Sequence, residues 1–375
     1  MQIYWSNYSV PLWFGFIQAW IYAFLFWKRA YQNNRLSDYL LGLVLVGMAF
    51  NIWEYMLGFS GIEILWQELN FLPRTFGLAL PPLCYFYFKS QIDKDFRFRL
   101  KDIFHFLPFL IDTLYRIIIF SMGKDFVQYF EKNYHNTWGI GHLELLTSIV
   151  LTAYYMYRAF KLYNQYRLWT KTQFSDIESV SFKWFRNLLL VLLLDWTVSL
   201  IKLVIISNFK LDFKQDWWDN LIGVILIYYI SITGYAQAQP TKDLVFKEAE
   251  DAVSENPPKE KFEEEELSKW KTKILHLMQE EQLYLQPELT LSDIASRLKT
   301  NVSVLSGVVN NAFGKNFNDF VNEYRVKEFQ KRALLPENKN ITLLGIAFDC
   351  GFNSKATFNR SFKKFTGKSP KEFLT

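Results

Sequence analysis

The hydrophobic and polar residues divide the chain into two parts that meet near Pro240. Before this proline long apolar stretches follow one another, and after it charged and apolar residues alternate as in water-soluble proteins. A helix needs roughly 20 mostly apolar residues to cross a bilayer core. Seven stretches approach that length: Val10–Trp27, Tyr39–Phe59, Phe71–Phe88, Ile103–Met122, Leu143–Tyr163, Leu188–Ser207 and Leu221–Tyr235. The pattern predicts an all-α protein whose residues 1–240 form a seven-helix transmembrane bundle.

The flanks of the first stretch predict its orientation. No basic residue precedes it, and Lys28 and Arg29 follow it directly. A cleavable signal peptide has the reverse charge order, so we expect an uncleaved anchor with its N-terminus outside. Pro81 and Pro82 predict a kink in the third stretch. The fourth stretch contains Asp112 and Arg116, which makes it the weakest candidate for a span.

The loops between the seven stretches have a strong charge bias. If the N-terminus is outside, the loops expected in the cytoplasm carry 14 basic residues and the opposite loops carry 4. This distribution agrees with the positive-inside rule. Seven spans then place the C-terminal part in the cytoplasm, whereas an even number would place it outside. We therefore expect an integral, multi-pass protein of the cytoplasmic (inner) membrane. The aromatic content of 19% also fits a membrane protein, because Trp and Tyr favour bilayer interfaces.

Seven ionisable residues fall within the apolar stretches or at their ends: Glu54, Arg74, Asp112, Arg116, Glu144, Asp195 and Lys202. Charges are costly in hydrocarbon, so we expect these side chains to face the interior of the bundle. Their spacing allows Asp112 to pair with Arg116 and places Asp195 and Lys202 on one helix face. Two interpretations remain open, an outward-facing polar pocket that binds a signal ligand and structural pairing between helices.

Residues 241–267 change abruptly to an acidic composition, with 4 basic and 10 acidic residues. Pro257 and Pro258 interrupt this segment, and we predict a flexible cytoplasmic linker. A helix is predicted from about Glu263, with one apolar stripe formed by Leu267, Trp270, Ile274, Leu277 and Met278. The stripe has two possible roles, a signalling or dimerising surface and packing on the domain that follows.

An internal repeat marks residues 268–375. The segment Thr290–Ala295 matches Thr342–Ala347, and Gly314–Phe320 matches Gly367–Phe373, with offsets of 52 and 53 residues. The repeat predicts two copies of one supersecondary unit. Each copy has the pattern of a helix-turn-helix, at about 290–313 and about 342–365.

The residues of each copy predict its caps and its core. Thr290 with Asp293 forms a capping box, and Asn301 caps the second helix. In the second copy Gly351 supplies a tight turn, and Asn353 or Ser354 caps the helix that follows. Apolar residues expected to face the core of that copy are Ile346, Ala347, Phe348, Phe358, Phe362 and Phe365. Phe317–Leu335 is predicted to be one long helix that joins the two copies.

These motifs resemble a known family. The segment Ile341–Phe373, with Gly351-Phe352-Asn353-Ser354 and Gly367-Lys368-Ser369-Pro370, is similar to the second half of an AraC/XylS-type DNA-binding domain. The first half fits through Leu291–Leu305 and Tyr324-Arg325, so the resemblance covers roughly Lys269–Thr375. The whole chain is similar in layout to membrane-anchored regulators of this type. The resemblance implies a sequence-specific transcription regulator, most often an activator that contacts RNA polymerase.

The non-core positions of each second helix are the candidates for contact with double-stranded DNA. They include Ser303, Ser306 and Asn310 in the first copy and Lys355, Asn359, Arg360, Lys363 and Lys364 in the second. Arg360 can read guanine and Asn359 or Asn310 adenine, whereas Lys363, Lys364 and Lys368 can hold phosphates. From Lys269 to the C-terminus the chain has 17 basic and 10 acidic residues, a balance that favours duplex binding. The first copy departs from the family, because its second helix has no basic residue and carries Gly307 where a long side chain is common.

Other classes of function find little support in the sequence. Cys84 and Cys350 are too few for a four-cysteine zinc site, and the 4 His form no metal motif. We therefore expect no cofactor and no metal, and since no catalytic set or phosphate-binding loop is visible we predict that the chain is not an enzyme. The alternative is a membrane transporter or receptor whose cytoplasmic tail is a regulatory or protein-binding module. A homodimer is possible, and the signal ligand, the operator and the sign of regulation are not encoded in a recognisable motif.

Overall fold

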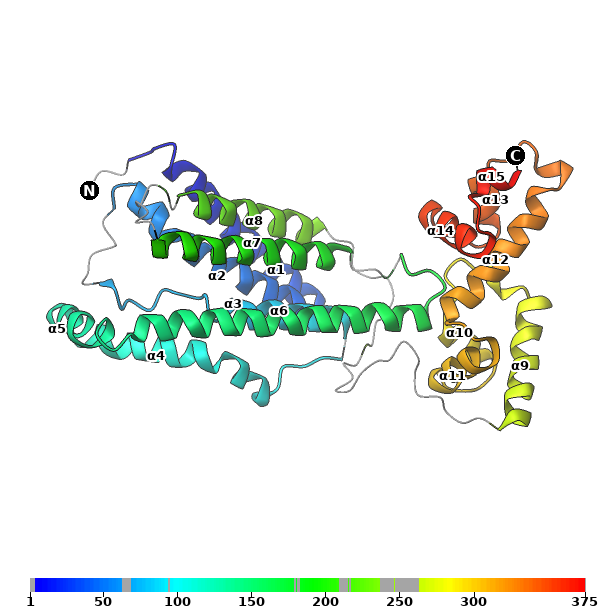
Figure 1. Cartoon of the computed structure of the whole chain (residues 1–375), viewed down its shortest axis with the longest axis horizontal. Helices are drawn as coiled ribbons and strands as arrows, with labels where there is room; N and C mark the ends of the chain where they lie inside the picture. Colours follow the sequence, from blue (N-terminus) through cyan, green and yellow to red (C-terminus); the bar gives the residue numbers. More distant parts are fainter. Residues whose placement is uncertain are drawn as a thin grey trace. The chain divides into compact units, whose positions relative to one another are not determined.

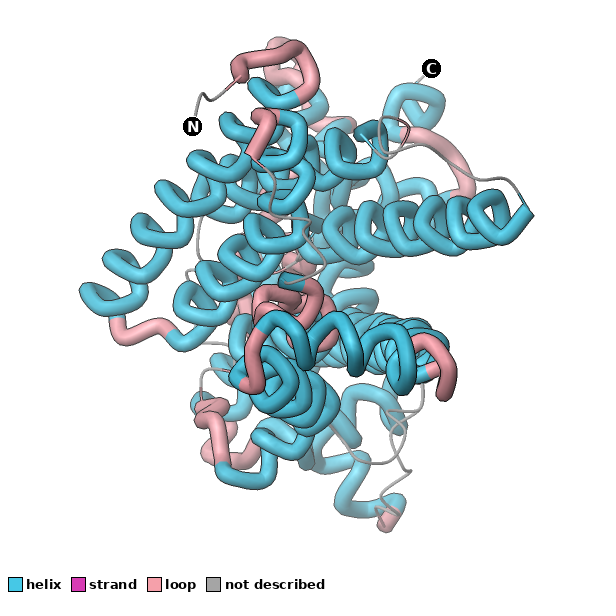
Figure 2. The backbone as a smooth tube through the Cα atoms, turned by 90° about the vertical axis from the view of Figure 1, so that its left-hand side faces the viewer, coloured by secondary structure: helices cyan, strands magenta, loops and turns pink. Residues whose placement is uncertain are grey.

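The computed structural model describes residues 4–62, 69–93, 95–178, 180, 183–208, 215, 217–236, 246 and 263–374. These residues form helices joined by loops (Figure 2). An isolated antiparallel bridge pairs Phe174 with Thr290. The chain divides into two compact units. The first comprises residues 1–162 and 182–245, and the second comprises residues 163–181 and 246–375. Most of the predicted linker, residues 241–267, lies outside the described residues.

The first unit is a bundle of helices (Figure 1). Its elements are α1 Ser9–Asn33, α2 Leu36–Phe59, α3 Leu80–Ile92, η2 Leu100–Phe106, α4 Leu107–Ser121, α5 Lys124–Phe130, η3 Glu131–His135, α6 Ile140–Gln173, α7 Lys183–Asn208 and α8 Trp217–Ala236. Part of α6 belongs to the second unit, because the boundary falls after Leu162.

Five of the described helices are long and apolar enough to cross a membrane. They are Ser9–Asn33, Leu36–Phe59, Leu100–Ser121, Lys183–Ile205 and Trp217–Ala236. They coincide with five of the seven predicted spans, including the fourth. At the third predicted span the helix α3 has only 13 residues. At the fifth, α6 has 34 residues but is more polar. The number seven therefore stays a prediction.

Small residues bring α1, α2 and α8 into close contact. Gly15 on α1 lies against Val224 on α8, Gly42 on α2 lies against Trp27, and a Cβ at either glycine would lie within 3.0 Å of the neighbouring side chain. Glycine at such positions lets helices in a bilayer approach each other and gain van der Waals contact.

Two hydrogen bonds define the relative direction of α1 and α8. Near their N-terminal ends, Trp217 Nε1 donates to the carbonyl oxygen of Tyr8 over 2.8 Å. Near their C-terminal ends, Arg29 Nη1 donates to the carbonyl oxygen of Tyr235 over 2.9 Å. Because like ends meet at both places, α1 and α8 run parallel.

The outward faces of this unit are apolar. Exposed large side chains include Phe14, Ile17 and Phe24 on α1, Ile111, Leu114 and Ile118 on α4, and Leu190, Leu194 and Ile201 on α7. Large apolar side chains that are exposed along three helices are unfavourable in water and favourable in hydrocarbon.

The second unit contains residues 163–181 and the C-terminal helices. These are α9 Glu264–Gln279, η4 Leu283–Leu285, α10 Leu291–Arg297, α11 Val302–Phe313, α12 Phe317–Ala333, η5 Pro336–Asn338, α13 Leu343–Asp349, α14 Lys355–Thr366 and α15 Pro370–Leu374. The predicted long helix is thus α12, with 17 residues and a length of about 25 Å.

The α12 helix belongs to two hydrophobic cores. Its Phe317, Phe320 and Val321 pack with α9, α10 and α11 in the first core. Its Val326 and Phe329 pack with α13 and α14 in the second core. One continuous helix therefore joins two helix pairs, α10–α11 and α13–α14, which we call the first and second helix pairs (Figure 1).

Two expectations about apolar residues can be compared with these cores. The stripe on α9 packs into the first core, where Ile274, Leu277 and Met278 are buried. This favours the packing role of the stripe over a dimerising one. The expectation that Phe348 lines the second core is wrong, because this side chain is 45% exposed. Phe348 follows Ala347 on a helix of seven residues and points away from the face that Ile346 buries.

Candidate functional site

The first helix pair begins at the predicted capping box. The Asp293 backbone N–H donates to Thr290 Oγ1 over 3.2 Å, and the Thr290 backbone N–H donates to Asp293 Oδ2 over 2.8 Å. Asn301 caps α11 by accepting from the Val304 backbone N–H at 2.8 Å. These caps satisfy the exposed backbone donors at both helix starts and fix where each helix begins.

The second helix pair turns at Gly351, whose φ is +89°. A Cβ there would lie 2.5 Å from the carbonyl oxygen of Tyr284, so only glycine fits this turn. Of the two predicted caps for α14, Ser354 is the one used, because its Oγ accepts from the Thr357 backbone N–H at 3.1 Å. Asn353 instead donates to Asp176 Oδ2 over 3.2 Å.

One face of α14 is exposed and basic. Thr357, Phe358, Ser361 and Phe362 are buried. The predicted DNA contacts Lys355, Asn359, Arg360 and Lys363 are exposed. Because the buried residues recur four positions apart on one face, the opposite face presents one guanidinium, one amide and two ammonium groups. Groups of these kinds bind base edges and phosphates of duplex DNA.

The corresponding face of α11 is neutral. Ser303 is exposed, while Ser306 and Asn310 are half-buried. The sequence Val302–Phe313 contains no charged residue. This helix offers hydroxyl and amide groups that can bond to bases, but nothing that neutralises a phosphate.

Lys364 differs from the other predicted DNA contacts because it has an ion-pair partner. Its Nζ lies 2.7 Å from Asp319 Oδ2, on the first turn of α12. The side chain is 54% exposed, so it remains accessible. The Asp319 carboxylate offsets part of the charge that Lys364 would bring to a phosphate, and the pair links α14 to α12.

The ionisable residues of the first unit form ion pairs between neighbouring elements. Glu54 on α2 pairs with the buried Arg74 in the segment before α3. Arg116 on α4 lies 3.0 Å from Asp112 and 2.9 Å from Glu144 on α6, which confirms the predicted i, i+4 pair and adds a third member.

Lys202 on α7 lies 3.0 Å from Asp219 on α8, a residue that the sequence did not nominate. The sequence placed Asp195 and Lys202 on one helix face, whereas the carboxylate that pairs with Lys202 comes from helix α8. Six of the seven nominated residues thus take part in these ion pairs, and a pocket that binds a signal ligand stays a prediction.

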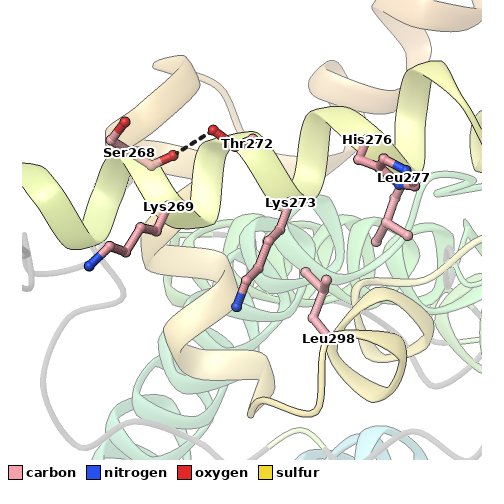
Figure 3. Close-up of a pocket in the computed structure, with 7 residues that line it drawn as sticks. All are labelled: Ser268, Lys269, Thr272, Lys273, His276, Leu277 and Leu298. Carbon is pink, nitrogen blue, oxygen red and sulfur yellow. Dashed lines mark hydrogen bonds between the residues drawn. The ribbon is translucent and has the colours of Figure 1, made fainter.

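A shallow pocket of about 640 Å³ lies on the second unit and was also not nominated (Figure 3). Its lining residues are Ser268, Lys269, Thr272, Lys273, His276, Leu277 and Leu298. Lys269, Lys273 and His276 occur at helical spacing on α9, the sequence signal that marks a shared face. The charges of Lys269 and Lys273 add to the basic character of the unit.

Among the residues that the structure describes, the largest fully buried side chain is Arg325 on α12. Its Nε donates to the carbonyl oxygen of Tyr284, and its Nη2 donates to that of Gln286, both over 2.7 Å. Burial lowers the pKa of Arg325 to about 10, and the nearby Asp176 carboxylate opposes this shift, so the guanidinium stays charged near neutral pH. The sequence does contain a signal for this site. Three polar residues occur four and three positions apart, on one face of the helix: Asn318, Asn322 and Arg325.

Comparison with known proteins finds similarity in the C-terminal region of the chain. Residues 294–375 match the family described as Helix-turn-helix domain, which is of the AraC type. An uncharacterized HTH-type transcriptional regulator of Staphylococcus aureus (strain COL) is 34% identical over 92 residues, or 24% of this chain and 12% of that protein. No solved structure matches the chain.

Two further transcription regulators are similar to this chain over a comparable length. The Uncharacterized HTH-type transcriptional regulator YtdP of Bacillus subtilis (strain 168) is 32% identical over 97 residues, or 26% of this chain and 12% of that protein. The Melibiose operon regulatory protein of Escherichia coli (strain K12) is 28% identical over 85 residues, or 23% of this chain and 27% of that protein. The chain therefore spans a minor part of the length of these relatives. The similarity indicates a DNA-binding transcription regulator, and it concerns the C-terminal quarter alone.

Proposed function

We propose that this chain is a membrane-bound, sequence-specific transcription regulator that binds duplex DNA through two tandem helix-turn-helix units and couples a signal at the membrane to gene expression. The two units are the first and second helix pairs. DNA is the principal partner, and RNA polymerase and a second copy of the chain are further partners that the family resemblance implies.

The observation that carries the proposal is the exposed basic face of α14 within a domain of the AraC type. Arg360 presents a planar fork of donors that can bond bidentately to guanine O6 and N7, and Asn359 can bond to adenine. Lys355 and Lys363 flank these residues and supply phosphate contacts. In this account α14 contributes most of the affinity, and the uncharged α11 contributes sequence preference through Ser303, Ser306 and Asn310.

The parallel direction of α1 and α8 supports a cytoplasmic DNA-binding domain. When two helices cross a membrane in the same direction, an odd number of crossings lies between them. The total number of crossings from α1 to α8, with both helices included, is therefore odd. This parity holds whether or not α3 and α6 are counted as spans. With the N-terminus outside, as the loop charges predict, the chain leaves α8 on the cytoplasmic side.

The ion pairs of the first unit support a structural role for the intramembrane charges. Arg116 joins α4 to α6 through Glu144, and Lys202 joins α7 to α8 through Asp219. Paired charges of this kind hold helices together at low cost. In our proposal they define the helix arrangement that a signal changes, and they are not the contacts that recognise its ligand.

A selection experiment with the full chain tests the proposal. The protein is reconstituted in lipid nanodiscs and mixed with sheared genomic DNA from its source organism, and bound fragments are sequenced and footprinted. We expect a small set of enriched fragments with protected major-groove contacts. Arg360→Ala should lose the enrichment, whereas Lys339→Ala, which removes an exposed charge away from α14, should retain it. Equal recovery of all fragments by wild type and Arg360→Ala would reject sequence-specific binding.

A further inference from the structure

A short segment between α6 and α7 is built into the interior of the second unit. Phe174, Ser175 and Asp176 are 8%, 0% and 5% exposed. The Ser175 backbone N–H donates to the carbonyl oxygen of Leu289 over 3.1 Å, and its Oγ donates to the same oxygen over 2.6 Å. We call residues Phe174–Asp176 the strap. Both sides of this contact belong to the second unit.

The polar face of α12 holds the backbone of the strap. Asn318 Nδ2 donates to the carbonyl oxygen of Ser175 over 2.7 Å, and Asn322 Nδ2 donates to the same oxygen over 3.3 Å. Arg325 Nη2 donates to Ser175 Oγ over 3.1 Å. Asn318, Asn322 and Arg325 are 7%, 1% and 0% exposed, so water cannot replace these bonds while the strap is in place.

The strap also supplies a negative charge to a buried positive one. The hydrogen bonds of Arg325 go to neutral oxygens of Tyr284, Gln286, Pro287, Asn322 and Ser175. Asp176 is the carboxylate whose field stabilises the guanidinium. A buried charge that loses its counter-charge is strongly destabilising, so the local structure around Arg325 depends on the strap.

Through Asp176 the strap reaches the second helix pair. Asn353, which directly precedes the Ser354 cap of α14, donates to Asp176 Oδ2 over 3.2 Å and to the carbonyl oxygen of Pro287 over 3.3 Å. The strap therefore contacts the first helix pair at Leu289 and Thr290, the α12 helix, and the turn before α14. These are the three parts whose mutual arrangement decides where α11 and α14 can meet one DNA duplex.

From these contacts we propose that the strap is a conformational switch: when docked it holds the two helix pairs in the arrangement that binds DNA, and its release lowers DNA affinity. The idea rests on the proposed DNA-binding function. The strap is covalently continuous with α6 on one side and precedes α7 on the other, and most of these two helices belongs to the first unit. A change in that unit reaches the second through the chain itself.

The exposure of the predicted DNA contacts indicates whether docking of the strap raises or lowers DNA affinity. With the strap docked, Lys355, Asn359, Arg360 and Lys363 are all exposed. The strap lies on the polar face of α12 and covers none of them. The docked form is therefore competent to bind DNA, and the strap acts as a support and not as an inhibitor.

The first test removes one strap contact in the full chain held in nanodiscs. Ser175→Ala deletes the hydroxyl that Arg325 and Leu289 share, and Thr172→Ala is the matched control on the last turn of α6. Hydrogen exchange of residues 284–290 and 351–354 reports docking without DNA, and a duplex selected by the wild-type chain reports affinity. We expect Ser175→Ala to accelerate hydrogen exchange of these residues about tenfold and to weaken binding of the selected duplex about tenfold. Thr172→Ala should change neither the exchange rate nor the affinity. Unchanged exchange and affinity in Ser175→Ala would overturn the proposal.

The second test locks the strap in place. Since the Ser175 N–H bonds to the Leu289 carbonyl, Phe174 and Thr290 form a non-hydrogen-bonded antiparallel pair, whose Cα atoms lie roughly 4.5 Å apart and suit a disulfide. The variant combines Phe174→Cys and Thr290→Cys with Cys84→Ser and Cys350→Ala. We expect the oxidised form to bind the selected duplex at least as tightly as the reduced form. Loss of binding on oxidation would show that the docked strap inhibits, and would overturn the proposal.

The two readouts separate this proposal from the proposed function. If the wild-type chain selects no DNA, the DNA-binding function is wrong and the effect assigned to the strap is wrong with it. Exchange in Ser175→Ala still decides whether the strap holds the two helix pairs together. If the wild-type chain selects DNA but Ser175→Ala binds it equally well, only the switch is rejected.

Discussion

Arg29 on α1 donates a hydrogen bond to the carbonyl oxygen of Tyr235 on α8, across 206 positions of the chain. The same guanidinium holds Asp38 at the start of α2 through two bonds of 2.7 Å. These bonds bring together the end of α1, the beginning of α2 and the end of α8. Together with the bond between Trp217 and Tyr8 at the opposite helix ends, this contact makes α1 and α8 parallel, and the proposed membrane topology rests on that direction.

The proposed topology of seven spans predicts which introduced cysteines an impermeant maleimide reaches. In a chain with Cys84→Ser and Cys350→Ala, Lys124→Cys should react in intact cells, because α4 is the fourth of the seven spans and ends on the outer side. Lys339→Cys should react only after the inner membrane is permeabilised. Labelling of Lys339→Cys in intact cells would place the second unit outside and reject the orientation.

Removal of the Arg360 guanidinium should weaken specific binding by about 1–3 kcal/mol and relax the preference at one base pair, as loss of one bidentate contact does. Fluorescence anisotropy with the selected duplex measures both effects. Lys363→Ala should weaken binding to all sequences similarly and reduce the salt slope by about 1. An Arg360→Ala variant with wild-type affinity and sequence preference would exclude α14 as the reading helix.

The first helix pair should contribute less to affinity than the second. Because α11 has no charge, Asn310→Ala removes an amide contact but no phosphate neutralisation. We expect a loss smaller than that of Arg360→Ala, and a salt slope equal to that of the wild type. Titration at several salt concentrations measures this. A change in the salt slope for Asn310→Ala would contradict the asymmetry.

Replacement of Arg325 tests how much its buried hydrogen bonds contribute to the stability of the second unit. Arg325→Met leaves the oxygens of Tyr284 and Gln286 without their donor and leaves Asp176 near an apolar group, so the second unit should lose about 3–5 kcal/mol. Exchange of the slowest amides of α12 in the full chain measures this free energy. Arg332→Met is the control, since its pair with Glu328 lies near the surface and should contribute no more than about 1 kcal/mol. Similar losses in both variants would contradict the account of Arg325.

Cys350 should be inert in the native chain. Burial raises the pKa of its thiol from 9.0 to about 12, so the reactive thiolate is scarce at neutral pH. The buried, protonated thiol contributes to the free energy of unfolding in full below the thiol pKa of the unfolded chain. This contribution is lost as the pH rises from about 9 toward 12, because the unfolded chain then ionises its thiol and the folded chain does not. In Cys84→Ser, iodoacetamide should modify Cys350 slowly in the native chain and rapidly in urea. Equal rates would contradict the burial.

Local patterns made much of the second unit predictable. The capping box at Thr290, the Asn301 cap and the Gly351 turn depend on residues three or four positions apart, so the sequence contains them completely. The α12 helix follows from its length and periodicity. Phe348 was misplaced because a helix of seven residues gives too few turns to define its buried face.

Contacts between distant segments were not predictable in this way. Asp219 pairs with Lys202, Lys364 pairs with Asp319, and Ser175 packs under Arg325, and each partner lies on another element. A single sequence states that a charge is present but not which helix will approach it. The strap is the clearest case, since Ser175 and Arg325 are 150 positions apart.

The central claim is that the membrane-bound chain binds particular DNA sequences. Its most direct test is crosslinking of the full chain to chromosomal DNA in living cells, followed by recovery from the membrane fraction and sequencing. We predict a few discrete sites of enrichment that disappear in Arg360→Ala and persist in Lys339→Ala. Uniform recovery of the chromosome, indistinguishable between wild type and Arg360→Ala, would contradict the claim.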